Sequence, residues 1–186
     1  MASVLEIERR YLIRYPRAEL LAALPDQTEI RQTYLLPDGI WDTHRVRRRG
    51  ISGDYHYTHT RKKRISSLSR IEEEKEISRE EYEQLLLRAD PERRTIEKIR
   101  CCWPYRGQLL EIDLFSFWQD RAILEIELTE EGQAVELPME LEIIREITGD
   151  KRYTNASLAR AIPYESIDAG NLCPGDPSKD QKGRME

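Results

Sequence analysis

Residues 6–13 read EIERRYLI, an unusual pattern for a β-strand. In an extended strand, side chains two positions apart lie on the same face, so Glu6, Glu8 and Arg10 share one face. The opposite face begins with Ile7. The stretch therefore predicts a strand with one charged face, which meets either bulk water or a polar interior.

The same period-two alternation recurs along the chain and predicts seven further strands. The eight predicted strands are Val4–Ile13, Thr28–Leu36, Asp42–Gly50, Asp54–Lys63, Ser69–Ile77, Thr95–Trp103, Gln108–Ser116 and Ala122–Thr129. So many strands in one small domain, with few helices, predict an all-β-dominated fold. A closed antiparallel barrel or a strongly curved sheet fits best, with the helices packed outside.

Helical signals are few and short. Residues 17–24 lie between two prolines, and residues 155–161 precede a third. Ser78 is a good N-cap because Glu81, three residues on, completes a capping box before an apolar stripe. The sequence therefore predicts three short helices.

Composition limits the class of protein. The 186 residues suit one domain, and 35% of them are charged, against roughly 25% in an ordinary domain. The net charge is only −5, which does not favour a nucleic-acid partner. No apolar run approaches the roughly 18 residues that span a membrane, and the first ten residues lack a secretory apolar stretch. Three cysteines without metal-ligand spacing predict a cytoplasmic protein.

The charged faces of the predicted strands are segregated by sign. The acidic pairs are Glu6/Glu8, Glu72/Glu74 and Glu125/Glu127, and the basic pairs are Arg45/Arg47 and Lys98/Arg100. For any single strand, a solvated outer face is the simpler interpretation. Like charges gathered on one face favour instead a site for ions of opposite sign. Carboxylates suit hard divalent cations, and arginine and lysine suit phosphate oxygens, so a lumen lined by both would suit a polyphosphate.

These segments resemble a known family. EIERRYLI is similar to the ExExK signature of the CYTH superfamily, the triphosphate tunnel metalloenzymes. The resemblance continues in order through RQTYL, HRVRRRG, THTRK, SRIEEEKEI, IEKIR, EIDLF, LEIEL and REITGDKRYTN. It implies an eight-stranded antiparallel barrel closed into a tunnel, and Mg2+- or Mn2+-dependent chemistry on a triphosphate-containing small molecule. It covers about residues 4–162, so residues 1–162 are predicted to form one domain and residues 163–186 a C-terminal extension that is partly disordered.

The resemblance also implies roles by position. It makes Glu6, Glu8, Glu125 and Glu127 the catalytic metal ligands, and it makes Arg45, Arg47, Lys62, Lys98, Arg100, Lys151 and Arg152 the phosphate-binding residues. It makes Glu72, Glu74 and Asp113 supporting acidic residues, which bind metal, orient water or hold basic neighbours. Arg10 departs from the family because the signature has lysine there. Arginine keeps the charge and can bind phosphate, but it does not readily give up a proton. Pairing of Arg10 with a carboxylate is the alternative.

The leading function hypothesis is metal-dependent hydrolysis of inorganic triphosphate, since EIER resembles the bacterial triphosphatase branch more than the class IV adenylate cyclase branch. The alternatives are hydrolysis of a nucleoside or thiamine triphosphate, cyclisation of ATP, or binding of polyphosphate or nucleotide without turnover. The sequence does not decide the oligomeric state, and a homodimer is one option.

Overall fold

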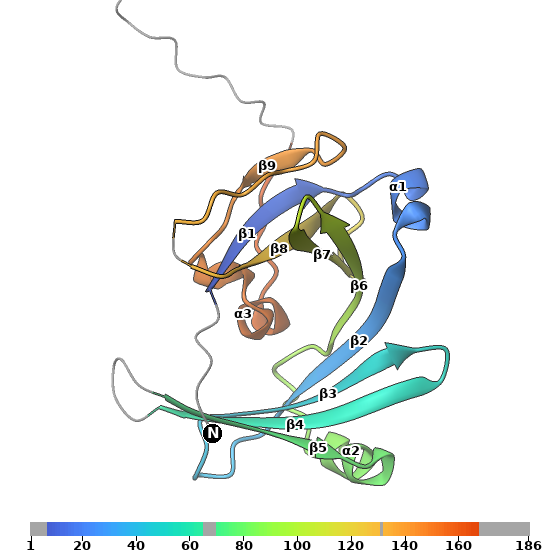
Figure 1. The fold of residues 1–186 in the computed structure, drawn as a ribbon. Coiled ribbons are helices and arrows are strands. Elements are labelled where there is room, and N and C mark those ends of the chain that lie inside the picture. The colour runs from blue at the N-terminus through green and yellow to red at the C-terminus, as the bar shows by residue number, and fades with distance from the viewer. Residues whose placement is uncertain (1–6, 65–69, 131, 168–186) are drawn as a thin grey trace, which may run out of the picture.

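Nine antiparallel β-strands form one sheet in the computed structural model, which describes residues 7–64, 70–130 and 132–167. The strand order across the sheet is β5-β4-β3-β2-β6-β7-β8-β1-β9. The strands are β1 (Ile7–Arg14), β2 (Asp26–Leu35), β3 (Thr43–Ile51), β4 (Asp54–Arg64), β5 (Arg70–Ile77), β6 (Ile96–Tyr105), β7 (Gln108–Phe115), β8 (Arg121–Leu128) and β9 (Ile143–Glu146). The sheet curves strongly, so that β3, β4 and β5 lie opposite β1, β8 and β9 (Figure 1).

The eight strands predicted from alternation are confirmed. Their ends agree within two residues, apart from the predicted start of the first strand at Val4, which lies outside the described residues. The prediction missed β9, which adds to the free edge of β1 through Tyr11↔Glu146 and Leu12↔Arg145. Four residues are too few to show a period. Pairing between the described strands leaves β5 and β9 as the two ends of the sheet, so the closed barrel is not confirmed.

The convex face of the sheet is apolar and carries two helices. α1 (Ala18–Ala23) and residues 135–143 lie over β1, β6, β7 and β8, where Ile13, Ile112 and Leu124 are fully buried. α2 (Arg79–Leu86) sets Tyr82 against Val46 of β3. Its N-terminus is capped as predicted, because the Ser78 hydroxyl accepts a hydrogen bond from the Glu81 N–H at 3.1 Å.

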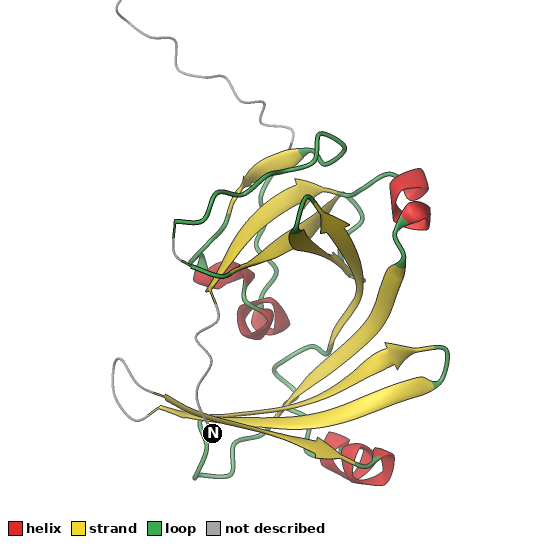
Figure 2. Cartoon of the chain, in the orientation of Figure 1, coloured by secondary structure: helices red, strands yellow, loops and turns green. Residues whose placement is uncertain are grey.

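The third helix packs on the concave face, so the prediction that the helices lie outside the sheet is wrong for it. The short 3-10 helix η1 (Lys151–Tyr153) leads into α3 (Asn155–Arg160), whose Leu158 packs in one cluster with Leu12 and Ile123. These two strand residues alternate with the charged positions of β1 and β8, so they share the concave face. Figure 2 shows α3 inside the curve and the other two helices outside it. One end of the concave face is therefore filled with apolar side chains.

No helix among the described residues is long and apolar enough to cross a membrane. The described part of the C-terminal extension, residues 163–167, is tied to the sheet. Glu165 accepts hydrogen bonds from Arg145 at 2.8 Å through its carboxylate and from Arg121 at 2.8 Å through its carbonyl. Residues 168–186, on which most of the predicted disorder falls, lie outside the described residues.

Candidate functional site

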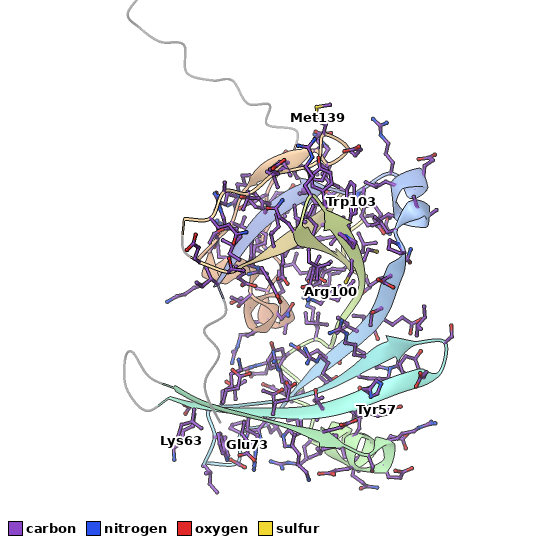
Figure 3. All side chains as sticks on the ribbon, in the orientation of Figure 1. Tyr57, Lys63, Glu73, Arg100, Trp103 and Met139 are labelled. Atoms are coloured by element: carbon purple, nitrogen blue, oxygen red, sulfur yellow. The ribbon has the colours of Figure 1, made fainter. Side chains whose placement is uncertain are left out.

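The register of the sheet places the charged alternating positions of seven strands on the concave face. Residues directly opposite each other in antiparallel strands share a face. The chain of opposite pairs runs Arg10↔Glu125, Glu125↔Glu111, Asp113↔Arg100, Lys98↔Ile30, Ile30↔Arg49, Arg47↔Thr58 and Thr58↔Glu76. In Figure 3, Arg100 points into the curve of the sheet, whereas Lys63 and Glu73 point away from it. Those charged strand residues that the structure describes, and that were predicted to face a polar interior, therefore share one concave face.

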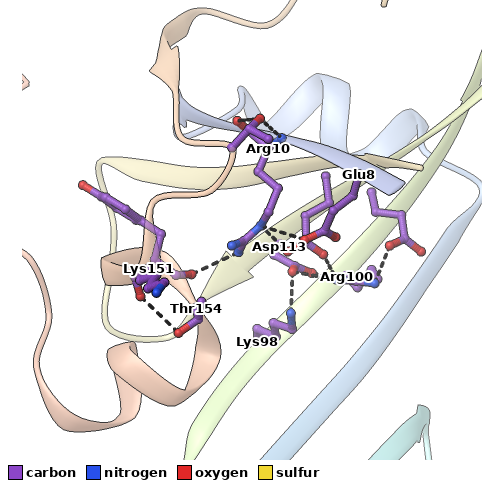
Figure 4. A network of polar contacts seen from close by, with 11 residues as sticks. Glu8, Arg10, Lys98, Arg100, Asp113, Lys151 and Thr154 are labelled. Carbon is purple, nitrogen blue, oxygen red and sulfur yellow. Dashed lines mark hydrogen bonds and ion pairs between the residues drawn. The ribbon is translucent and has the colours of Figure 1, made fainter. Parts of the chain in front are cut away.

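Arg100 of β6 is the centre of this face (Figure 4). Its Nε and Nη2 donate to the two oxygens of Asp113, each at 2.8 Å. Nη2 also donates to Glu125 Oε2 at 2.5 Å, and Nη1 donates to Glu111. Burial by itself would lower the pKa of Arg100, but the hydrogen bonds and charges of these three carboxylates outweigh it and raise that pKa. The guanidinium is therefore a permanent cation that holds three acidic side chains together.

Asp113 of β7 is the most deeply buried charge of the face, with a side chain that is 0% exposed. Besides Arg100, it accepts a hydrogen bond from the Lys98 ammonium. Burial acts to raise the pKa of Asp113, but the charges of Lys98 and Arg100 prevail and lower it. The neighbouring Glu111 differs, because burial there dominates and raises its pKa in spite of Arg100. The pair Lys98–Asp113 thus forms a buried ionic support beneath Arg100.

Arg10 of β1 links the charged network to the apolar end of the face. Its Nε donates to Glu125 Oε1 at 3.0 Å, and its Nη2 donates to the backbone carbonyl of Tyr153 in η1 at 3.0 Å. Glu8 Oε1 lies 3.8 Å from the same Nε. The Arg10 side chain is only 10% exposed. Of the two uses predicted for Arg10, the structure shows the carboxylate pairing.

The four predicted metal ligands are placed unequally. Glu6 lies outside the described residues. Glu8 and Glu127 are exposed and lie directly opposite each other on β1 and β8. Glu125 lies one inward position further along β8, with a side chain only 13% exposed. Within residues 7–64, 70–130 and 132–167, no three Asp, Glu, His or Cys side chains are arranged to hold a metal ion. Instead, the guanidinium groups of Arg10 and Arg100 lie beside two of these carboxylates.

A second group of opposite charges lines the concave face of β3, β4 and β5. Lys62 Nζ lies 2.7 Å from Glu72 Oε2, and Arg47 Nη2 lies 3.4 Å from Glu74 Oε1. Arg45 Nη2 is within 4 Å of both glutamates, at 3.7 Å and 3.9 Å. Burial lowers the pKa of Arg47, although Glu74 opposes that effect. Every one of these basic side chains is thus already close to a carboxylate.

Lys151 and Arg152 lie in η1, beside the buried end of the face. Both are exposed. The Arg152 guanidinium donates to Asp150 at 2.7 and 3.0 Å, and it lies 3.3 Å from Glu165. Arg152 is therefore held by carboxylates outside the network of Arg10 and Arg100.

Sequence reasoning missed two members of the network. Glu111 alternates with Asp113 on β7, so the period-two pattern carries a signal for it, but the family resemblance selected Asp113 alone. The Tyr153 carbonyl that receives Arg10 is a backbone atom, for which no residue type is diagnostic. The face as a whole can bind a polyanion and cations by exchanging the partners that its charges already have.

No family model matches the chain. A curated relative, the inorganic triphosphatase of Nitrosomonas europaea, is 33% identical over 161 residues, which are 85% of this chain and 99% of that protein. The solved structure of the hypothetical protein NE1496 is 30% identical and has a TM-score of 0.60, covering 86% of this chain and all of the other. That of the inorganic triphosphatase NE1496 is also 30% identical, with a TM-score of 0.57, covering 88% of this chain and all of the other. The chain therefore belongs to the CYTH superfamily, the triphosphate tunnel metalloenzymes.

Proposed function

We propose that the protein hydrolyses inorganic triphosphate on the concave face of its sheet. The observation that carries the proposal is the register, which gathers the cations and carboxylates of seven strands onto that one face. A triphosphate chain carries several negative charges, and phosphoryl transfer requires mainly that they be positioned and neutralised. The relative named inorganic triphosphatase, which aligns over almost its whole length, supports this substrate.

The phosphate oxygens would bind to basic side chains on both walls of the curve. Arg45, Arg47 and Lys62 come from β3 and β4. Lys98 and Arg100 come from β6, and Arg10 comes from β1. Arg152 and Lys151 would approach the chain of phosphates from η1. Arginine offers two parallel donors to a phosphate, and Lys98 offers a point charge, so together they would fix the substrate and stabilise charge developing on the leaving oxygen.

A bound Mg2+ or Mn2+ would lower the pKa of a water and so supply the nucleophile. The donor set fits such an ion, because Glu6, Glu8, Glu125 and Glu127 all offer the carboxylate oxygens that hard cations prefer. Glu72, Glu74 and Asp113 would act as supporting acids. Their contacts with Arg45, Arg47, Lys62, Lys98 and Arg100 favour the holding of basic neighbours over metal ligation.

The working form of the domain, in this proposal, is the closed eight-stranded tunnel expected for the family. The strong curvature of the sheet supports it (Figure 1). Closure on a bound triphosphate analogue would slow amide hydrogen exchange in β5, which is one end of the described sheet. Unchanged exchange in β5 would argue for a site that stays open.

We also infer a cytoplasmic enzyme that acts on a small molecule, without a nucleic-acid or membrane partner. The free thiols of Cys101 and Cys102 support a reducing compartment. A homodimer stays a prediction, which light scattering of the purified chain would test.

The decisive experiment measures product from tripolyphosphate, ATP and thiamine triphosphate, each with and without Mg2+ or Mn2+. Release of inorganic phosphate from tripolyphosphate, faster than from the organic triphosphates and dependent on the ion, is the expected result. Cyclic AMP from ATP would support the cyclase instead. Binding of tripolyphosphate without release of product would support a binding module that has no catalytic activity.

A further inference from the structure

We infer that Arg10 is a built-in counter-ion of Glu125, which must leave that carboxylate before a divalent cation can bind there. The inference rests on the proposed function, because it takes Glu125 as a metal ligand. It makes Arg10 a positioning residue that compensates the charge of Glu125 when the site is empty and that moves away from Glu125 when substrate binds.

Both oxygens of Glu125 already have cationic partners. Arg10 Nε lies 3.0 Å from Oε1, and Arg100 Nη2 lies 2.5 Å from Oε2. The Glu125 side chain is 13% exposed, so little water screens these charges. A Mg2+ ion would have to approach one of the oxygens to about 2.1 Å, where it would meet two guanidinium groups. The arrangement therefore opposes binding of a cation on its own.

The two arginines differ in how firmly they are held. Arg100 makes a two-pronged contact with the fully buried Asp113, so it keeps its position if Glu125 is taken away. Arg10 has, besides Glu125, the neutral carbonyl of Tyr153 at 3.0 Å and the more distant Glu8 at 3.8 Å. A neutral acceptor binds a guanidinium less strongly than a carboxylate does. Arg10 is thus the partner that can be exchanged.

A triphosphate supplies the anion that Arg10 needs in exchange. When a phosphate oxygen accepts the hydrogen bonds of the Arg10 guanidinium, Glu125 loses one cationic partner and becomes available to a divalent ion. The coupling free energy between two bound ligands is reciprocal. Triphosphate therefore tightens the binding of metal by the same factor as metal tightens the binding of triphosphate. Arginine suits this exchange because it remains charged whichever anion it faces.

The test measures the affinity of the protein for Mn2+ alone, without any phosphate. Free Mn2+ is followed by electron paramagnetic resonance in the wild type, in Arg10→Gln and in Arg9→Gln. Arg9→Gln is the matched control, because Arg9 neighbours Arg10 in β1 but pairs with Glu146 away from the network, with a side chain 37% exposed. Loss of a unit charge a few ångströms from the ion corresponds to about a tenfold change in affinity.

We expect Arg10→Gln to bind Mn2+ about tenfold more tightly than the wild type, and Arg9→Gln to bind it within about twofold. Unchanged or weaker binding by Arg10→Gln would overturn the inference, because a residue that merely supports the ligand would weaken binding when removed. Absence of Mn2+ binding in every variant would overturn it as well.

Two further measurements separate possible causes of failure. Circular dichroism checks that Arg10→Gln is folded, and Arg10→Met, which retains most of the side-chain volume, replaces it if it is not. Phosphate release from tripolyphosphate by the wild type tests the proposed function independently. An active, ion-dependent wild type with no tighter Mn2+ binding in Arg10→Gln would reject the exchange and keep the function. An inactive wild type, together with tighter Mn2+ binding by Arg10→Gln, would reject the proposed function and keep the exchange.

Discussion

Asp113→Asn tests whether the concave face depends on buried ionic support. The Asp113 side chain is 0% exposed and has Lys98 and Arg100 as partners. Asparagine keeps the size of the side chain but removes its negative charge, so that two buried cations lose a common anion. The change therefore probes the ionic pairing with little change in packing.

The expected cost follows from what each cation retains. Removing one partner of a buried ion pair costs about 3–5 kcal/mol, because the other charge is left without compensation. Arg100 keeps Glu111 and Glu125 after the change, whereas the side chain of Lys98, 4% exposed, loses its carboxylate. We therefore expect the lower end of that range, about 3 kcal/mol. With a urea m-value of about 2 kcal/mol/M, the unfolding midpoint would fall by about 1.5 M.

Urea unfolding followed by circular dichroism at pH 7 measures the effect. Glu73→Gln is the control, since it removes a similar charge from an outward pair with Arg61 whose side chains are 33% and 47% exposed. An exposed pair of this kind contributes about 1 kcal/mol or less. A loss for Asp113→Asn no larger than that of Glu73→Gln would refute the argument, because it would mean that Lys98 and Arg100 are not desolvated.

The pH dependence gives a second measure of the same pairing. Burial raises the pKa of Asp113, but Lys98 and Arg100 outweigh it, and the folded-state pKa is lowered. A lowered folded pKa stabilises the fold above the unfolded pKa of about 3.9, and that contribution is lost as pH falls through the folded pKa. The wild type should lose stability below about pH 4, and Asp113→Asn should lose less over the same interval.

Three further substitutions test other parts of the molecule. Glu127→Gln should lower phosphate release from tripolyphosphate at least about 100-fold with an unchanged urea midpoint, because it removes a proposed metal ligand from an exposed position; near wild-type turnover would remove Glu127 from the metal site. Arg47→Ala should raise the Michaelis constant for tripolyphosphate about tenfold through loss of a charged hydrogen bond, and an unchanged constant would argue against phosphate contact. Ser78→Ala should lower the free energy of unfolding by about 1 kcal/mol through loss of the helix cap, and urea unfolding with no such loss would show that the cap is dispensable.

Most of the fold prediction rests on the alternation of apolar and charged residues, because this alternation shows which face of a strand each side chain lies on. Glu125 and Glu127 could be assigned to one face of β8 without knowledge of its neighbours, and the register confirms the assignment. The same alternation predicted that α2 lies on the convex side, because the apolar face of a strand must be buried against another element.

The features that could not be predicted from the sequence depend on contacts between segments that are distant in the chain. The partners of Arg100 come from β7 and β8, so they depend on register and strand order, which a single strand does not encode. The sequence therefore predicted phosphate binding for Arg100, which stays a prediction, but not the three carboxylates that accept hydrogen bonds from its guanidinium. α3 was placed on the wrong side of the sheet for a similar reason, since its apolar residues are compatible with either face.

The arrangement of charge explains how this sheet can tolerate a polar concave face. Apolar residues cover the convex side, beneath α1 and α2, and one end of the concave side, beneath α3. The charged side chains on the rest of the concave side must therefore pair with one another. Desolvated charges are stable only in close pairs, and the pairs of Lys98 with Asp113 and of Arg100 with Asp113 meet that condition. A polyanion that enters such a face does not find bare cations. In the proposed function it would have to replace carboxylates, and each replacement would free an oxygen ligand for a metal ion. The proposal therefore predicts that binding of the anion and assembly of the cation site are one event, because the same arginines would take part in both.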